Sequence, residues 1–411
     1  MTGTAPRAGV VPVAQVVSYY PPHLGGMEKV AEIIAAELAG TRPSTVLTTR
    51  VGAAGEPHLV RRGNLTVRRY PAFEAAHTPF APGLLAGLLG LPRRGVVHVH
   101  VAQVLVPELV WLASRLRGWP FVAHFHLDVD PSGPLGALFV AYKKLLLGRT
   151  LRAADRVLVL SPEQAELVRG RYQVPEARIA VIPNGVEVAY FDLAAERFAR
   201  LEPKAADRAE AGDTAGAAGT GVAADLAAGT SQVPEAEPTP MRLLFVGRLA
   251  SQKNVPRLVE AMALVRGPVE LVVAGDGEDR GAVEALVAER GLTNVRLVGG
   301  QYGADLLGWY RWADAFALPS EKEGVPLAML EAMAAGLAVL STDVPGSRDL
   351  LGDAGLLVAP DAAHIAAGID ALAADPAERL RLGRRAHAQV ADRRWPDLVE
   401  QIAKIYADVT R

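Results

Sequence analysis

The segment Glu323-Gly324-Val325-Pro326-Leu327-Ala328-Met329-Leu330-Glu331 decides how the second half of this chain is interpreted. It follows the apolar run Ala315-Phe316-Ala317-Leu318, which predicts a buried strand. Pro326 suits the first position of a helix and Gly336 the residue after its end, so the segment's first glutamate is expected in a loop and its last inside a short helix. Unpaired N–H groups at a helix N-terminus favour an anion. This element can offer two carboxylates for sugar hydroxyls and amides for a phosphate, although a solvated turn with incidental glutamates has the same pattern.

Length and composition favour two domains. The chain has 411 residues, half of them hydrophobic, which is enough for two buried cores. Its net charge of −2 gives no reason to expect nucleic acid as a partner. The absence of cysteine excludes disulfides, thiolate metal ligands and a cysteine nucleophile. Residues 10–17 predict a strand rather than a signal peptide, and no apolar run approaches the ~20 residues of a membrane span, so we expect a cytoplasmic protein without stable membrane insertion.

Strands and helices alternate in both halves of the chain, which predicts two Rossmann-like, doubly wound α/β domains with parallel sheets that face each other across a cleft. Between them, residues 194–240 are rich in Ala, Gly, Thr, Glu and Asp and poor in large apolar residues. This composition is typical of a linker or surface insertion that is disordered over much of its length. The expected parts are an N-terminal domain over 1–193, the linker over 194–240, a C-terminal domain over 241–392 and a last helix over 393–411.

Histidines and carboxylates gather where two strands of the first half end. His100 ends one strand and fits a core or rim position better than a catalytic one. Alternation along the next strand puts His124 and His126 on one face, and His126, the later of the two, is expected to reach the ligand-binding edge of the sheet. Asp128 and Asp130 follow. Four alternating groups on one extended strand cannot converge on one metal ion, so we expect these carboxylates to meet hydroxyls or amines of a substrate.

Glycines and cations follow further strands. Gly25-Gly26 lies at a strand-to-helix turn, where a ligand can approach the backbone closely. Arg248 and Lys253 flank another such turn, which suits binding of a diphosphate, although surface charges at a helix start have the same spacing. Gly275-Asp276-Gly277 lacks the third glycine of a dinucleotide fingerprint, because residue 280 is arginine. The chain also lacks a P-loop and a Gly-x-Ser-x-Gly elbow.

Together these positions resemble the retaining, nucleotide-sugar-dependent glycosyltransferases of family four, which have the GT-B architecture of two Rossmann-like domains. The matching residues are Gly25-Gly26 with Glu28, His126, Asn184-Gly185-Val186, Gly247-Arg248-Leu249 with Lys253, Gly275-Asp276-Gly277, and Glu323 to Glu331. The last helix with Trp395 is similar to the family's crossover back to the N-terminal domain. The chain departs from the family at Glu187, where aspartate is usual, and in the length of its inter-domain connection.

The resemblance implies that the N-terminal domain binds the acceptor and the C-terminal domain the nucleotide sugar. For donor binding it implies Gly25, Gly26, Arg248, Lys253, Gly324, Val325, Pro326, Leu327 and Glu331, with Glu331 on the ribose hydroxyls. For catalysis it implies His126 and Glu323 near the donor sugar and Arg248 and Lys253 on its diphosphate. Asp128, Asp130 and Asn184 are the expected acceptor-binding residues. It implies no metal and no cofactor besides the nucleotide-sugar co-substrate, because cationic side chains replace the metal.

The segment 126–134 indicates the acceptor. It resembles the corresponding segment of transferases that act on the aminocyclitol 2-deoxystreptamine in aminoglycoside antibiotic pathways. Their donors are UDP-N-acetylglucosamine or UDP-glucose. The expected function is therefore retaining transfer of a hexose or N-acetylhexosamine from a UDP sugar to a small, polar, cationic acceptor. The alternatives are phosphatidylinositol- or inositol-phosphate-directed transfer, for which Lys143-Lys144 is the only hint of a lipid-facing surface, and a nucleotide-sugar epimerase on the same fold. The oligomeric state stays open, with a homodimer as one candidate.

Overall fold

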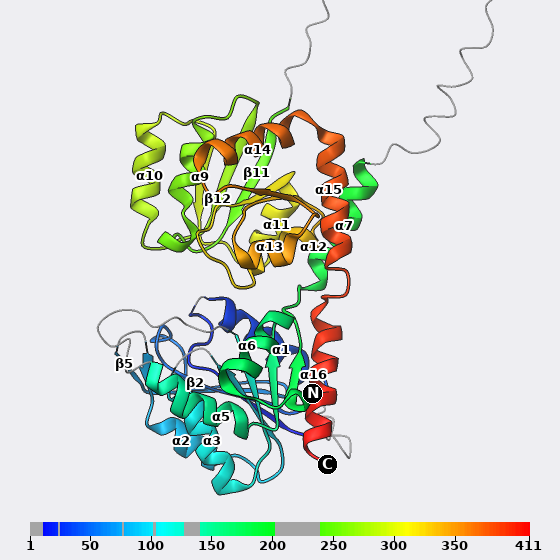
Figure 1. The fold of residues 1–411 in the computed structure, drawn as a ribbon. Helices are drawn as coiled ribbons and strands as arrows, with labels where there is room; N and C mark the ends of the chain where they lie inside the picture. Colours follow the sequence, from blue (N-terminus) through cyan, green and yellow to red (C-terminus); the bar gives the residue numbers. More distant parts are fainter. Residues whose placement is uncertain (1–10, 24, 76–77, 102–103, 127–139, 202–238) are drawn as a thin grey trace, which may run out of the picture. The chain divides into compact units, whose positions relative to one another are not determined.

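The computed structural model describes residues 11–23, 25–75, 78–101, 104–126, 140–201 and 239–411. The chain forms two compact units (Figure 1), each with its own hydrophobic core. Unit 1 comprises Met1–Gly185 together with Asp392–Arg411, and unit 2 comprises Val186–Ala391. The expected pair of Rossmann-like parallel-sheet domains is confirmed. No helix in the described ranges is long and apolar enough to cross a membrane.

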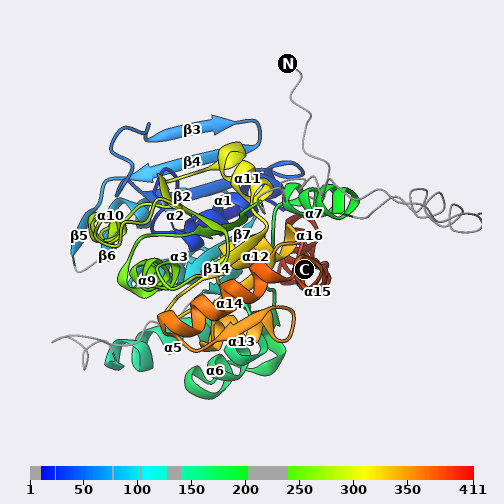
Figure 2. The same cartoon turned by 90° about the horizontal axis from the view of Figure 1, so that it is seen from above.

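Unit 1 is built on an eight-stranded sheet in which only β3 runs antiparallel to its neighbour, β4. Figure 2 shows β2, β4 and β3 side by side at one edge of this sheet. A small hairpin joins β5 (Phe73–Ala75) to β6 (Thr78–Phe80). In spatial order the eight strands are β10 (Ile179–Val181), β9 (Arg156–Val159), β8 (Phe121–Phe125), β7 (Val96–Val101), β1 (Val13–Val16), β2 (Ser44–Thr49), β4 (Leu65–Tyr70) and β3 (Leu59–Arg62).

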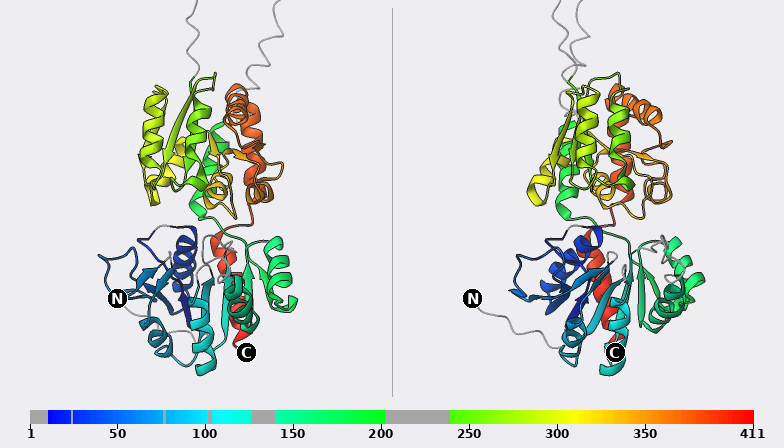
Figure 3. Two further views of the ribbon diagram at one scale, coloured as in Figure 1. Left: turned by 60° about the vertical axis from the view of Figure 1, so that its left-hand side comes forward. Right: turned by 90° about the vertical axis from the view of Figure 1, so that its left-hand side faces the viewer.

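The helices of unit 1 include the last helix of the chain, α16 (Trp395–Val409), which packs beside α1 (Gly26–Ala39) (Figure 3). Trp395, Leu398 and Ile402 of α16 are buried, which explains why a C-terminal segment returns to this unit. The other helical segments are α2 (Gly83–Leu89), α3 (Val106–Arg117), η1 (Lys143–Leu147), α5 (Gly148–Ala153), α6 (Pro162–Tyr172) and η2 (Glu176–Arg178).

Unit 2 has a six-stranded, fully parallel sheet whose strands are near-continuous apolar runs, as expected when helices cover both faces. The strands in spatial order are β13 (Val295–Gly299), β12 (Val269–Ala274), β11 (Met241–Val246), β14 (Ala315–Leu318), β15 (Ala338–Thr342) and β16 (Leu356–Val358). The helices are α7 (Val188–Leu201), η4 (Ser251–Lys253), α9 (Val255–Met262), α10 (Arg280–Glu289), α11 (Gly303–Trp312), α12 (Leu327–Ala334), α13 (Pro345–Leu351), α14 (Ala362–Ala374) and α15 (Pro376–Gln389).

The prediction of a linker from residue 194 onward is wrong for the first eight residues, because residues 194–201 continue helix α7. Residues 202–238 lie outside the described ranges. Ala is a strong helix former, and Ala194 of this Ala-rich stretch is fully buried in unit 2. The composition that we interpreted as a linker therefore includes a packed helix.

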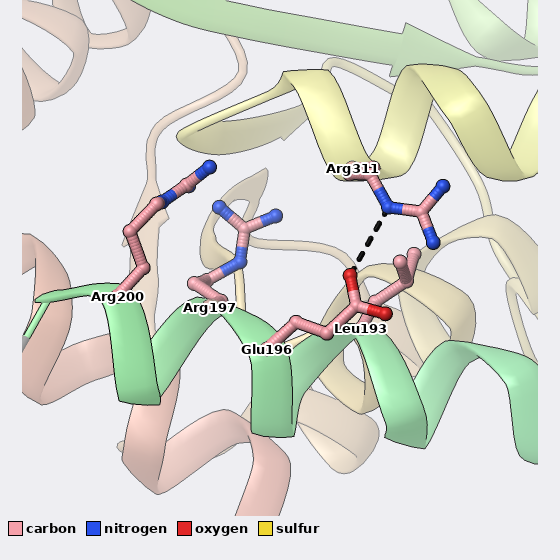
Figure 4. Close-up of a pocket in the computed structure, with 5 residues that line it drawn as sticks. All are labelled: Leu193, Glu196, Arg197, Arg200 and Arg311. Carbon is pink, nitrogen blue, oxygen red and sulfur yellow. Dashed lines mark hydrogen bonds and ion pairs between the residues drawn. The ribbon is translucent and has the colours of Figure 1, made fainter.

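Arg197 ties helix α7 to the rest of unit 2. Its buried guanidinium donates hydrogen bonds to the carbonyl oxygens of Ala335 (3.0 Å), Ala313 (2.7 Å) and Tyr310 (2.8 Å), which lie at or near the C-terminal ends of α12 and α11. Burial lowers the pKa of Arg197 to about 10, so this side chain stays charged at neutral pH. The cavity of about 170 Å³ beside it is lined by Leu193, Glu196, Arg197, Arg200 and Arg311, and Figure 4 shows the ion pair of Glu196 with Arg311 across it.

Candidate functional site

Lys253 and Glu323, both predicted as catalytic residues, form an ion pair in unit 2. Lys253 Nζ lies 2.6 Å from Glu323 Oε1, and only 4% of the Glu323 side chain and 21% of the Lys253 side chain are exposed. The two residues follow β11 and β14, which are neighbours in the sheet. Because parallel strands end on the same edge, the pair sits at the carboxyl edge where open α/β sheets bind ligands.

A network of polar contacts holds the two loops that carry this pair. Glu321 accepts a hydrogen bond from Nδ2 of Asn254 (2.6 Å) and forms an ion pair with Arg257. Gln252 donates from Nε2 to the carbonyl of Lys322 (2.7 Å), and the Glu321 amide donates to the carbonyl of Gln252 (2.9 Å). Asn254 has a φ of 45° and caps α9. This network joins the two loops that carry Lys253 and Glu323.

Arg248 lies on an exposed turn that is tied to the next strand end. Leu249 donates its amide to the carbonyl of Asp276 (2.9 Å). A Cβ on Gly275 would lie 1.9 Å from the carbonyl oxygen of Gly247, so only glycine allows this close approach. The Arg248 side chain is 71% exposed and pairs with Glu278 at 3.2 Å, a contact that an incoming anion can replace.

Helix α12 begins one residue later than expected, because Pro326 is its N-cap and Leu327 its first residue. The expected C-terminal glycine is confirmed: Gly336 follows the C-cap with a φ of +68°. Glu331 lies inside the helix, as predicted, and accepts a hydrogen bond from the buried Tyr310 hydroxyl (2.8 Å). Burial, and next the charge of Glu331, raise the pKa of Tyr310 well above its usual value, so the phenol remains a donor.

Gly25 and Gly26 lie in unit 1, where Gly25 is the N-cap of α1 and Gly26 its first residue. A Cβ on Gly25 would lie 2.1 Å from a carboxylate oxygen of Glu28, so the Glu28 side chain folds over the turn. Burial raises the pKa of Glu28, and its carboxylate lies 3.4 Å from Nδ1 of His23. The turn expected to bind a phosphate therefore has a buried carboxyl group beside it.

His126 follows β8 in unit 1, and hydrogen bonds to both its backbone and its ring hold it in place. Its amide donates to the carbonyl of Val101 (3.2 Å), and its carbonyl accepts from Nε2 of Gln164 (3.2 Å). On the ring, Nε2 lies 2.8 Å from Nδ1 of His100. His100 is fully buried, as the core interpretation of this residue expected.

Ring nitrogens of His98, His100 and His124 lie within 4.8 Å of one another, close enough for a metal ion to be considered. Five of the six ring nitrogens are engaged with each other or with side chains around them, whereas Nε2 of His124 has no partner among the described residues. His98 bonds to the Tyr406 hydroxyl and to Nδ1 of His124 (3.2 Å), and His100 bonds to the side chain of Gln15 (2.8 Å). We therefore interpret the cluster as a hydrogen-bonded network and retain the expectation that the site needs no metal.

Asn184 is buried in unit 1, and its Oδ1 has no partner among the described residues. The following Gly185 packs against α16, because a Cβ there would lie 2.7 Å from the ring of Trp395. The other two expected acceptor residues, Asp128 and Asp130, lie outside the described ranges.

Several residues around these sites were not predicted. Tyr310 lies inside a helix with no local signal for its partner. Glu321 was not distinguished from surrounding loop charges. Gln15 had a usable signal, because it is a polar residue inside the apolar run of the first strand.

Comparison with known proteins assigns both units to one class of enzyme. Residues 25–185 match the model described as glycosyl transferase 4-like domain, and residues 230–389 match the model described as glycosyl transferases group 1. A D-inositol 3-phosphate glycosyltransferase of Arthrobacter sp. (strain FB24) is 32% identical over 412 residues, covering 89% of this chain and 86% of that protein. A glycogen synthase of Mycobacterium tuberculosis is 26% identical over 392 residues, covering 90% and 84%.

Among solved structures, the Anabaena protein HepE in complex with UDP and glucose superposes with a TM-score of 0.67 at 17% identity. The match covers 97% of this chain and 100% of that one. At this identity the likeness establishes the fold.

Proposed function

Because the chain belongs to the GT-B glycosyltransferases of group 1, with a region of the glycosyl transferase 4-like type, we propose that it is a retaining hexosyltransferase. It moves a hexose or N-acetylhexosamine from a nucleoside diphosphate sugar to a hydroxyl of a small cyclitol. The observation that carries this proposal is the shielded Lys253–Glu323 pair at a carboxyl edge of parallel strands, with Arg248 on the same turn as Lys253.

The two cations serve the leaving group. Breaking the bond between the sugar carbon and the phosphate oxygen builds negative charge on the diphosphate, and preorganised cations and amides stabilise that charge. Lys253 is already oriented by Glu323, and Arg248 exchanges Glu278 for the phosphate. Amides in the first turn of α12 add further donors. In this proposal these groups replace a metal ion, so chelation of divalent ions leaves activity intact.

The two glutamates have different roles. Glu323 contacts the donor sugar near its reacting carbon, and Glu331 binds the ribose hydroxyls while Tyr310 fixes its orientation. No described side chain has the environment of an activated nucleophile, so we favour front-face attack over double displacement. The acceptor oxygen bonds to the sugar carbon on the face that the diphosphate leaves, and the acceptor proton passes to the departing phosphate oxygen.

Two cyclitols compete as acceptor. The relative that is 32% identical is named for D-inositol 3-phosphate, which favours an inositol phosphate. The resemblance of segment 126–134, with Asp128 and Asp130, favours the cationic 2-deoxystreptamine. UDP is the donor nucleotide we favour, and the GT-B structure solved with UDP and glucose supports it at the level of fold.

The test is incubation with UDP-glucose, UDP-N-acetylglucosamine and GDP-mannose, each with an inositol phosphate, with 2-deoxystreptamine and with no acceptor. Mass spectrometry detects the product, and ¹H NMR determines the configuration of its sugar. A glycosylated cyclitol whose anomeric configuration matches the donor, formed equally in the presence of EDTA, supports the proposal. Isomerised nucleotide sugar formed without any acceptor would instead identify an epimerase. Inversion of configuration would refute retention.

Arg248→Ala tests the site assignment. Removing a charge that stabilises the leaving group is expected to lower kcat about 100-fold. Arg381→Ala is the matched control, because Arg381 is also exposed and paired with a glutamate, Glu378, but lies on α15. Near-wild-type turnover of the Arg248 variant would overturn the assignment.

A further inference from the structure

Four imidazoles meet on two neighbouring strands of unit 1. His98 and His100 alternate along β7, His124 lies on β8, and His126 follows it, so their side chains share one face of the sheet. The register pairs His100 with His124, and β1 on the other side of β7 pairs Gln15 with His98. The first three histidines and Gln15 are fully buried. Buried ring nitrogens away from water find most of their hydrogen-bond partners among neighbouring side chains.

The cluster contains two separate hydrogen-bonded branches. The first runs from Gln15 Oε1 to His100 Nε2 (2.8 Å) and from His100 Nδ1 to His126 Nε2 (2.8 Å). The planes of the His100 and His126 rings differ by 18°, which suits a hydrogen bond in the ring plane. The second branch runs from Tyr406 through His98 to His124 and ends at His124 Nε2, which is buried without a partner among the described residues.

The first branch determines where its protons lie. Gln15 turns its side-chain oxygen toward His100, and its amide nitrogen has no partner among the described residues. In this orientation the oxygen accepts, so Nε2 of His100 carries the proton. A neutral imidazole has one N–H, which makes Nδ1 of His100 an acceptor and Nε2 of His126 the donor to it. Both rings are neutral at physiological pH, because burial lowers the pKa of His126 to about 3 and that of His100 well below its usual value. Nδ1 of His126 is left with a bare lone pair.

We propose that Gln15 and His100 are positioning residues that hold His126 as its Nε2–H tautomer, so that Nδ1 accepts a hydrogen bond from a hydroxyl of the substrate. Among the described residues Nδ1 has no partner, and His126 is only half-buried as a residue, unlike the other three histidines. We call the chain of hydrogen bonds from Gln15 through His100 to His126 the relay. A bare nitrogen attracts a hydroxyl and repels phosphate or carboxylate oxygens, so the relay selects for a neutral hydroxyl at Nδ1 of His126. The identity of that hydroxyl as part of a sugar or cyclitol rests on the proposed function.

The tautomer can be measured directly. Imidazole ¹⁵N NMR of the histidine-labelled full chain distinguishes protonated from bare ring nitrogens, and a His126→Ala spectrum assigns the signal. In the wild type, His126 is expected to be protonated on Nε2 alone. Gln15→Leu removes the acceptor that orients His100 and is expected to give a mixture of His126 tautomers. Gln15→Glu keeps an acceptor oxygen and is expected to retain the wild-type tautomer.

Kinetics provide the second readout. Loss of one oriented hydrogen bond in Gln15→Leu is expected to lower kcat/KM about 10-fold, with recovery in Gln15→Glu. Tyr406→Phe is the matched control, because it removes a buried partner from the other branch. It is expected to leave the His126 tautomer unchanged.

A wild-type His126 protonated on Nδ1 overturns the relay, and so does a Tyr406→Phe variant that shifts the His126 tautomer as much as Gln15→Leu. Failure of the proposed function is separate, because absence of glycosyl transfer with every donor leaves the NMR result intact. If transfer occurs and Gln15→Leu changes neither tautomer nor kcat/KM, the relay is refuted and the function stands.

Discussion

Acidification from about pH 7.5 to about pH 5.5 is expected to destabilise unit 1 selectively, because its sheet contains three fully buried, neutral imidazoles. Burial lowers the pKa of His98 to about 3 and holds the pKa values of His100 and His124 well below the usual 6.5. Neighbouring histidines in the cluster lower these pKa values further. The folded unit therefore takes up no proton on these rings at about pH 5.5, whereas the unfolded chain does.

The sign and size of the effect follow from proton linkage. Above the unfolded pKa of 6.5 both states are neutral at these rings, so the free energy of unfolding does not depend on pH through them. Below it, each histidine protonates only in the unfolded chain, which favours unfolding by about 1.4 kcal/mol per pH unit. His126 of the same unit behaves alike, because burial lowers its pKa to about 3. One unit below 6.5, the four histidines together amount to about 6 kcal/mol.

Two carboxyl groups of the same unit, those of the buried Glu28 and the half-buried Glu108, act in the opposite sense. Burial raises the pKa of Glu28 and of Glu108 in the folded state. They therefore take up protons at a higher pH when folded than when unfolded, and this uptake favours the folded state on acidification. Their contribution reduces the expected loss, so the net change is expected between about 3 and about 6 kcal/mol.

The assay is urea unfolding followed by pulsed hydrogen exchange and mass spectrometry at both pH values. Peptides covering β7 and β8 report unit 1, and peptides covering β11 and β12 report unit 2 in the same sample. Unit 2 is the internal control, because its two histidines, His364 and His387, lie outside the strands. Its unfolding midpoint is expected to change little.

A loss below about 1 kcal/mol in unit 1, or an equal loss in both units, would refute the reasoning. His124→Leu tests the stoichiometry, because it removes one of the four titrating groups. Whatever its own stability, the pH-dependent loss in this variant is expected to be smaller by about 1.4 kcal/mol.

Three further predictions test unit 2. Lys253→Met leaves the buried Glu323 carboxylate unpaired and is expected to cost about 3 kcal/mol in urea unfolding and about 100-fold in kcat/KM. Adding Glu323→Gln should restore stability but not turnover. An unchanged stability of the single variant would contradict the pairing. Tyr310→Phe should lower the free energy of unfolding by about 1 kcal/mol and raise the KM for the donor about 5-fold, with little change in kcat. A fall in kcat alone would contradict a role in ribose binding. Arg197→Met leaves three carbonyls without their donor and should lower the free energy of unfolding by about 3 kcal/mol. The same change at the exposed Arg200 should lower it by about 0.5 kcal/mol or less. Similar losses in both variants would contradict a stabilising role of the three Arg197 hydrogen bonds.

The features that could be predicted from the sequence are those that depend on residues close together along the chain. The strand before Glu323, the helix after it and the glycine at its end are determined by apolar runs and end signals within a few residues. The last eight residues of helix α7 were missed because the alanines there were interpreted by composition alone. Their packing involves Ala194 in the core of unit 2, and Arg197 bonds to carbonyls more than 100 residues away along the chain.

The relay through His100 marks the point where such prediction stops. Alternation identified His124 and His126 as sharing one face, but it could not identify their neighbours, because that depends on the strand order β8-β7-β1. Gln15 and His100 are 85 residues apart, and His100 and His126 are 26 apart, and they meet only because three parallel strands are in register. A one-residue slip of β7 would turn His100 to the opposite face. The tautomer of His126 is therefore a property of the whole sheet, which is why a substitution as remote in sequence as Gln15→Leu is expected to reach it.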